Sequence, residues 1–239
     1  MTIIEFLKDL VYRASKLITD EVVIKAKDDK GDLVTNFDYE IENFMCAEIK
    51  KNYPNFDIIS EEFNSKGQLS RNCFVLDPID GTVNFSHKFP LWGIQIACIR
   101  EGEVCASVIY LPKFEEMYWA DETGCYMNDK KIQVNNYSYD KNLISVEGRN
   151  RLQIMANMER LNRNVRGIYS SSVSFSYVAS GIFGGVILIQ DSAWDYIPGQ
   201  YLVKQAGGFI LNEKSFHIAS NNKELGLFLL EKAKSIDEK

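Results

Sequence analysis

The stretch that most constrains this chain is the run Asp77-Pro78-Ile79-Asp80-Gly81-Thr82. It follows the apolar segment 73–76, which is typical of a buried strand, and it places two carboxylates three residues apart. Pro78 fixes its own φ and favours extended backbone at Asp77, so we expect a stiff turn. Two carboxylates on a rigid turn repel each other, and a hard divalent cation with oxygen ligands relieves that repulsion. An ordinary Asp/Gly turn would look similar, so the interpretation depends on the rest of the chain.

Length and composition narrow the classes of protein. The 239 residues can bury a large core, as one domain or as two closely packed halves. The formal net charge of −6 argues against a nucleic-acid-binding protein, which normally has a basic face. The two histidines and the five cysteines, which form no C-x-x-C pair, argue against a zinc site. We expect a cytoplasmic protein that does not enter a membrane, because its longest apolar run is too short to span a bilayer and its N-terminus does not resemble a signal peptide.

Apolar periodicity predicts an N-terminal α+β half, about residues 1–142, and a C-terminal α/β half, about residues 143–239, packed as one domain. In the first half we expect a helix after a capping box at Thr2, a helix over about 38–51, a strand over 57–60 and an antiparallel meander over 92–100, 104–110, 117–120, 125–127 and 131–134. In the second half we expect strands over 143–147 and 186–189, helices over 152–161, 173–179, 195–206 and 222–235, and a hairpin over 209–218.

Four other acidic features lie where strands are expected to end or helices to begin. They are Asp32, Asp38, the pair Glu61-Glu62, and Asp195. Each alone has a structural explanation, as a helix N-cap or a solvated turn. Together they offer oxygen ligands from distant parts of the chain, which suits Mg²⁺ better than Zn²⁺.

A carboxylate-bound Mg²⁺ indicates phosphoryl chemistry. The sequence contains neither a G-x-x-x-x-G-K-[ST] loop nor the protein-kinase motifs, so the hydrolysis of a phosphate ester by metal-activated water is the chemistry that remains. A helix that begins after Gly81-Thr82 would direct backbone N–H groups at a phosphate.

The order of these motifs resembles the inositol monophosphatase family of Mg²⁺-dependent, lithium-sensitive sugar phosphatases, and the resemblance covers nearly the whole chain. The matching segments are Asp32-Leu33-Val34-Thr35 with Asp38, Glu61-Glu62, Asp77 to Thr82 with its continuation to Pro90, Trp194-Asp195 with Gly199 and Gln205 to Gly208, and Ala219-Ser220-Asn221.

This resemblance implies a layered α/β/α/β/α sandwich, usually dimeric, that hydrolyses inositol monophosphate or a similar sugar or polyol phosphate with Mg²⁺ as cofactor. The metal ligands that it implies are Glu61, Asp77, the Ile79 carbonyl, Asp80 and Asp195. The residues that it implies for catalysis, including the positioning of the attacking water, are Glu61, Thr82, Asp80, Thr35 and Asp38. The substrate contacts that it implies are Asp80, Gly81, Thr82 and Asp195. Lys27, or the nearby Lys25, stands at the spacing of a lysine on the family's mobile loop.

Two positions depart from the family pattern. The second motif continues as Tyr196-Ile197-Pro198-Gly199, and we expect Pro198 in the first turn of its helix, where a missing N–H costs little. Leu188 stands where the family has a glutamate that contacts the inositol ring, which allows the polyol end of the substrate to differ from inositol. Asp191, the nearest carboxylate, is out of register.

Several alternatives remain open on the sequence. Fructose 1,6-bisphosphate, a nucleotide 3′-phosphate and histidinol phosphate are alternative substrates, and a regulatory binding protein or a purely structural cation site are alternative roles. Ser170-Ser171-Ser172 is interpreted either as a substrate contact or as a serine-rich helix start. The arginines at 149, 151, 160, 163 and 166 are interpreted either as a solvated face, which we favour, or as an attraction for a phosphorylated substrate.

Overall fold

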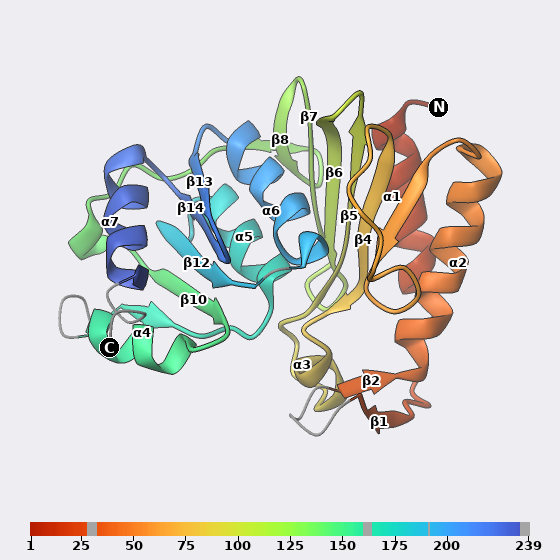
Figure 1. Ribbon diagram of the computed structural model, residues 1–239, viewed down its shortest axis with the longest axis horizontal. Coiled ribbons are helices and arrows are strands. Elements are labelled where there is room, and N and C mark those ends of the chain that lie inside the picture. The colour runs from red at the N-terminus through yellow and green to blue at the C-terminus, as the bar shows by residue number, and fades with distance from the viewer. Residues whose placement is uncertain (28–32, 160–163, 191, 235–239) are drawn as a thin grey trace.

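The computed structural model describes residues 1–27, 33–159, 164–190 and 192–234, and these form five layers (Figure 1). Helices α1 (Ile3–Ser15) and α2 (Asn36–Asn52) cover the outer face of a seven-stranded sheet. Helices α5 (Ser171–Ala179) and α6 (Ala193–Gln205) lie between this sheet and a five-stranded sheet. Helices α4 (Arg151–Glu159) and α7 (Lys223–Lys234) cover the far side. The expected α/β/α/β/α sandwich is therefore confirmed.

The seven-stranded sheet comes entirely from the first half of the chain. Its strands follow sequence order: β3 (Asp57–Ser60), β4 (Cys73–Asp80), β5 (Gly93–Arg100), β6 (Glu103–Leu111), β7 (Glu116–Asp121), β8 (Gly124–Met127) and β9 (Lys130–Ile132). Only β3 and β4 pair in parallel. The remaining pairs are antiparallel, and those from β5 to β9 form the predicted meander. Every residue of β4 is buried, because helices pack on both faces of the sheet at this strand.

The five-stranded sheet comes from the second half. Its spatial order is β11 (Val165–Arg166), β10 (Ile144–Gly148), β12 (Gly185–Ile189), β14 (Phe216–Ser220) and β13 (Phe209–Glu213). The first three strands are parallel, and β14 pairs antiparallel to both β12 and β13. The short strand β11 lies outside the predicted elements, because two residues are too few to show a periodic pattern.

Apolar residues from both halves meet between the sheets. One buried cluster joins Ile109 and Leu111 of β6 to Val173 of α5, Val186 of β12 and Leu202 of α6. This shared core packs β6 and β12 of the two sheets against the helices that lie between them.

Three smaller elements complete the described chain. They are the ribbon β1 (Ile24–Ala26) and β2 (Leu33–Thr35), the short helix α3 (Thr82–Ser86), and a 3₁₀ turn at Tyr139–Lys141. The predictions for Asp32, Arg160, Arg163 and Asp191 fall outside the described residues. In the part of the chain that the structure describes, each helix is too short or too polar to cross a bilayer.

The expectation for Pro198 was wrong. Helix α6 begins at Ala193, after the N-cap Ser192, so Pro198 lies in the helix interior and cannot donate a hydrogen bond to the carbonyl of Trp194. The Pro198 carbonyl accepts a hydrogen bond of 2.8 Å from the Ser107 hydroxyl on β6. Tertiary contacts with the seven-stranded sheet therefore keep this helix continuous where its own backbone bonding is weakened.

Candidate active site

The two aspartates of the Asp77–Thr82 run reach one side of β4 through a β-bulge. We expected a turn after Leu76, but the strand continues to Asp80. Asp77 pairs with Gln95 and Asp80 with Gly93, so three steps on β4 face two steps on β5. Residues three apart in a regular strand point to opposite faces, and the extra residue reverses that relation. Pro78 lies in the bulge, where the ladder does not need its missing N–H.

A third carboxylate, that of Asp195 in the first turn of α6, joins this pair. Asp77, Asp80 and Asp195 each offer an oxygen within 4.8 Å of the others. Burial, followed by repulsion from Glu61 and Asp80, raises the pKa of Asp77 and of Asp195 well above the ordinary value. Charges so close together and so deeply buried need a cation to stay ionised. Three carboxylates without nitrogen or sulfur donors suit Mg²⁺, so the residues present fit the metal that the sequence predicts.

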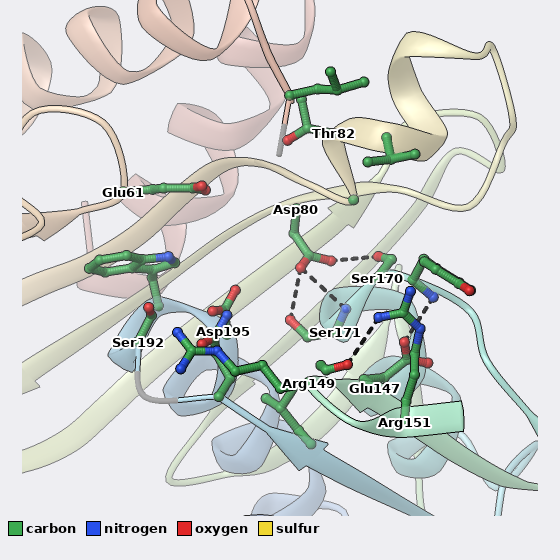
Figure 2. Close-up of a pocket in the computed structure, with 18 of the residues that line it drawn as sticks. Glu61, Asp80, Thr82, Glu147, Arg149, Arg151, Ser170, Ser171, Ser192 and Asp195 are labelled. Atoms are coloured by element: carbon green, nitrogen blue, oxygen red, sulfur yellow. Dashed lines mark hydrogen bonds between the residues drawn. The ribbon is translucent and has the colours of Figure 1, made fainter. Parts of the chain in front are cut away.

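Asp80 is also tied to the N-terminus of α5, as the dashed lines in Figure 2 show in part. Its Oδ2 accepts from the hydroxyls of Ser170 and Ser172, at 2.5 and 2.6 Å, and from the Ser172 N–H at 2.8 Å. Its Oδ1 accepts from the Ser171 hydroxyl and N–H, at 2.9 and 3.2 Å. The serine run is therefore a helix start, as one of our two interpretations held, and it also orients Asp80 across the gap between the two halves.

Glu61 follows β3 and lies outside the three-carboxylate cluster. Its Oε1 lies 2.9 Å from the Lys27 ammonium, which is also 2.7 Å from Glu62. Burial raises the pKa of Glu61 to about 7, against the opposing charge of Lys27. Lys27, rather than the exposed Lys25, is the lysine that meets the acidic pair.

Glu42 is a buried carboxylate that the sequence analysis missed, and it positions the segment that carries Glu61. Glu42 on α2 accepts hydrogen bonds from the backbone N–H groups of Glu62 and Phe63, both at 2.8 Å, and from the Ser60 hydroxyl. Its side chain is fully buried, and burial raises its pKa. The available signal was an acidic residue among the apolar positions of a predicted helix.

The predicted pair Thr35 and Asp38 lies beside Thr82. Asp38 is the third residue of α2 and not its N-cap, which is Thr35. One Asp38 oxygen accepts from the Thr35 N–H and hydroxyl, at 2.7 and 2.5 Å, and the other lies 3.4 Å from the Thr82 hydroxyl. Burial raises the Asp38 pKa to about 6. Asp38 therefore stays protonated to a higher pH than an ordinary aspartate does.

Gly81 and Thr82 begin helix α3. Gly81 is the N-cap, with φ of 89°, and Thr82 is the first helical residue. The Thr82 hydroxyl donates to the Ile79 carbonyl at 3.0 Å. The first N–H groups of a helix have no partners within it, so this turn offers donors to an anion.

Another buried carboxylate supports the opposite side of the site. Glu147, at the end of β10, accepts from the backbone N–H groups of Ile168 and Tyr169 at 2.9 and 2.8 Å. The Ser145 and Ser174 hydroxyls complete its hydrogen bonds. Glu147 thus holds the segment that leads into Ser170, and sequence analysis did not single it out.

These residues surround a cavity of about 590 Å³. Its lining includes Glu61 from the β3 end, Asp80 and Thr82 from the β4 end, and Asp195 from α6 (Figure 2). His87 is exposed at the end of α3 and does not line this cavity.

Comparison with known proteins decides the family. The family model described as "Inositol monophosphatase family" matches residues 2–225. The chain belongs to the inositol monophosphatase family. It is a phosphoric monoester hydrolase, and its cofactor is Mg²⁺.

Individual relatives are similar over most of their length. An inositol-1-monophosphatase of Mesorhizobium japonicum is 33% identical over 191 residues, which are 75% of this chain and 72% of the relative. A fructose-1,6-bisphosphatase/inositol-1-monophosphatase of Aquifex aeolicus is 30% identical over 229 residues, 90% of this chain and 86% of the relative. The solved structure of the Thermotoga maritima IMPase has a TM-score of 0.86 at 27% identity, and covers 98% of this chain and 96% of its own. This chain therefore has the same fold as the Thermotoga maritima IMPase over nearly its whole length.

Proposed function

We propose that this chain hydrolyses inositol monophosphate or a similar sugar or polyol monophosphate at the cavity beside Asp80. The observation that carries this proposal is the cluster of Asp77, Asp80 and Asp195 beside the start of α3, whose first N–H groups have no acceptor within the helix. We assign Mg²⁺ to these three carboxylates, with Glu61 and the Ile79 carbonyl as further ligands. When bound, Mg²⁺ neutralises phosphate charge and makes water acidic enough to act as the nucleophile.

The residues of this chain position the substrate and move the proton. The N–H groups of Gly81 and Thr82 bind the phosphate oxygens, since they lie at an N-terminus that favours negative charge. Thr82 orients the attacking water, because its hydroxyl is fixed by the Ile79 carbonyl and lies beside Asp38. Asp38, with its pKa of about 6, accepts the proton that this water loses, and Thr35 holds it in place.

Lys27 competes with the metal for Glu61. Its ammonium lies 2.9 Å from the Glu61 Oε1, so this ion pair has to loosen before that oxygen binds a metal. We therefore expect the Lys27–Glu61 ion pair to differ between the metal-free and the metal-bound protein.

The wider setting is also a proposal. We propose a cytoplasmic homodimer that acts on a small phosphorylated substrate without nucleic-acid or membrane partners. The five free cysteines support a reducing compartment, and the acidic net charge argues against nucleic acid. The homodimer rests on family resemblance, and analytical ultracentrifugation would test it.

The test is inorganic phosphate release from inositol 1-phosphate, fructose 1,6-bisphosphate, adenosine 3′,5′-bisphosphate and histidinol phosphate, with and without Mg²⁺. Fructose 1,6-bisphosphate belongs on the panel because the Aquifex aeolicus relative carries both activities in its name. We expect Mg²⁺-dependent release from at least one ester, and its loss in Asp195→Asn. Asp195 is preferred to Asp80 for this variant. At position 80 the N–H₂ group of an asparagine could not accept the hydrogen bonds that the serine N–H and hydroxyl groups donate to Asp80. Normal turnover by Asp195→Asn would overturn the site.

A further inference from the structure

Gln95 is a buried amide that lies beside the three-carboxylate cluster. Strand β5 reads Ile94-Gln95-Ile96, and both isoleucines pack into the core cluster that contains α1 and α2. Side chains alternate along a strand, so Gln95 faces the other side of the sheet, toward α5 and α6. Its register partner on β4 is Asp77. Directly opposed residues of an antiparallel pair share a face, with Cβ atoms about 4.5–5.5 Å apart, so Gln95 lies next to Asp77.

The amide of Gln95 is connected to Asp80 through one serine. The Gln95 Nε2 donates to the Ser171 hydroxyl at 3.2 Å, and that hydroxyl donates to the Asp80 Oδ1 at 2.9 Å (Figure 2). Hydrogen bonds in such a chain strengthen one another, because each bond polarises the group that makes the next one. Gln95 of β5 therefore acts on Asp80 of β4 through the first residue of α5.

The position of β5 that faces Asp80 carries a glycine, which leaves room for a second serine. Gly93 is the register partner of Asp80, and a Cβ at Gly93 would lie 2.7 Å from the Ser172 Oγ. The Ser172 hydroxyl donates to the Asp80 Oδ2 at 2.6 Å. Strand β5 therefore has an amide opposite Asp77 and an open position opposite Asp80, and both accommodate serines of α5.

The amide of Gln95 contributes little to the stability of the fold. Gln95 is fully buried, and its neighbour on β6 is Ile109, which belongs to the apolar layer between the sheets. The Gln95 Oε1 has no hydrogen-bond partner among the described residues. A buried carbonyl oxygen without a donor is unfavourable, and an apolar side chain of similar size avoids that penalty. The connection to Asp80 therefore explains this glutamine better than the packing of the core does.

We infer that Gln95 is a positioning residue for the metal centre, which fixes the Asp80 carboxylate through Ser171 before Mg²⁺ binds. This inference rests on the proposed function, because Asp80 is a ligand of Mg²⁺ only within that proposal. A carboxylate that is already held in one orientation loses less freedom when the cation arrives. Loss of the Gln95 amide should therefore weaken Mg²⁺ binding without destabilising the metal-free protein.

Gln95→Leu tests both parts of this expectation. Leucine has a similar volume, and it removes the unpartnered oxygen together with the donor to Ser171. We expect the Tm of the metal-free protein to stay within about 3 °C of wild type or to rise. The Kd for Mg²⁺ should rise about fivefold, as expected for the loss of one hydrogen bond. Isothermal titration with Mg²⁺ alone measures Kd, and circular dichroism measures the Tm and its rise when Mg²⁺ is added.

A double-mutant cycle with Ser171→Ala tests whether Gln95 acts through this serine. Ser171→Ala alone should weaken Mg²⁺ binding about fivefold or more, since Asp80 loses a hydroxyl donor. Adding Gln95→Leu to Ser171→Ala should change the Kd by less than about twofold, because the connection is already broken. Losses that multiply in the double variant would contradict the path through Ser171.

Gln200→Leu is the matched control. Gln200 is a buried glutamine of α6, and its amide exchanges two hydrogen bonds with Asn212, at 2.6 and 3.1 Å. These bonds stabilise the fold and do not lead to Asp80. The variant should therefore lower the Tm of the metal-free protein by about 2–6 °C. Its Kd for Mg²⁺ should stay within about twofold of wild type.

Two results with Gln95→Leu would overturn the inference. A wild-type Kd for Mg²⁺ would mean that Asp80 does not depend on the amide. A weaker Kd together with a fall in Tm as large as that of Gln200→Leu would leave Gln95 with a structural role only.

Asp195→Asn separates these failures from failure of the proposed function. If Asp195→Asn abolishes the Mg²⁺-induced rise in Tm while Gln95→Leu keeps it in full, the inference fails and the proposed metal site stands. If Asp195→Asn binds Mg²⁺ as tightly as wild type, the proposed metal site fails, and the inference fails with it.

Discussion

Gly81→Ala tests whether the two halves of the molecule approach each other at the Gly81-Thr82 turn as closely as the structure shows. Gly81 has φ of 89°, in the region that side chains rarely adopt. An added Cβ would lie 3.0 Å from the Ser170 Cβ, 3.2 Å from the Tyr169 carbonyl oxygen and 3.3 Å from the Leu91 carbonyl oxygen. Two of these neighbours are backbone atoms, so they cannot rotate away.

The expected loss of stability has two parts. A left-handed conformation costs about 1–2 kcal/mol for a residue other than glycine. Overpacking against fixed atoms costs about 1–3 kcal/mol, and the stiffer unfolded chain returns about 0.4–1 kcal/mol. We expect a net loss of about 2–4 kcal/mol, which for a chain of this size lowers Tm by about 4–16 °C.

Gly102→Ala is the control for the backbone term. Gly102 has φ of 91°, nearly the same as Gly81, but an added Cβ there meets no atom within 4 Å. This variant should therefore lose no more than about 1.6 kcal/mol of stability, because only the backbone strain remains. The difference in stability between the two variants isolates the crowding of Gly81 against Leu91, Tyr169 and Ser170.

Thermal unfolding followed by circular dichroism gives both Tm values, and Mg²⁺-dependent phosphate release gives the activity. We expect Gly81→Ala to lose about tenfold or more in kcat, since a displaced Ser170 no longer orients Asp80. Equal Tm values for the two variants would refute the close approach. Normal kcat in a destabilised Gly81→Ala protein would refute the link from Ser170 to the site.

Two further variants test buried carboxylates in the metal-free protein. Because burial raises the Asp38 pKa from 3.8 to about 6, its folded form gains a proton, and stability is lost as pH rises between these values. The stability of Asp38→Asn relative to wild type should therefore rise by up to about 3 kcal/mol between pH 4 and 6.5, at about 1.4 kcal/mol per pH unit. Urea unfolding across this pH range measures the difference in stability. A difference that does not change with pH would contradict the burial argument. Glu42→Gln should lose about 1–3 kcal/mol of stability and should need a higher Mg²⁺ concentration for activity. The reason is that its amide nitrogen cannot accept a hydrogen bond from one of the backbone N–H groups that follow β3. Glu40→Gln, exposed on the same helix, should stay within about 0.5 kcal/mol of wild type, and similar losses in the two variants would argue against the positioning role.

Sequence reasoning predicted the elements well where a pattern repeats over many residues. The capping box at Thr2, the meander from β5 to β9 and helix α5 all follow from local periodicity and turn residues. It failed where distant contacts override a local rule. Pro198 lies inside α6 because the Ser107 hydroxyl and the packed sheet support a helix that sequence alone would begin later.

The candidate site shows the same division. Asp77, Asp80 and Asp195 could be named as candidate metal ligands from the sequence, since they stand in motifs specific enough to identify the family. How they are held depends on tertiary contacts: the bulge turns Asp77 and Asp80 to one side, and the serines at the start of α5 orient Asp80. Carboxylate chemistry belongs to a residue and can be read from its identity. Register, close approach and shared hydrogen bonds belong to pairs of residues far apart in the chain, and they exist only once the two sheets have packed together.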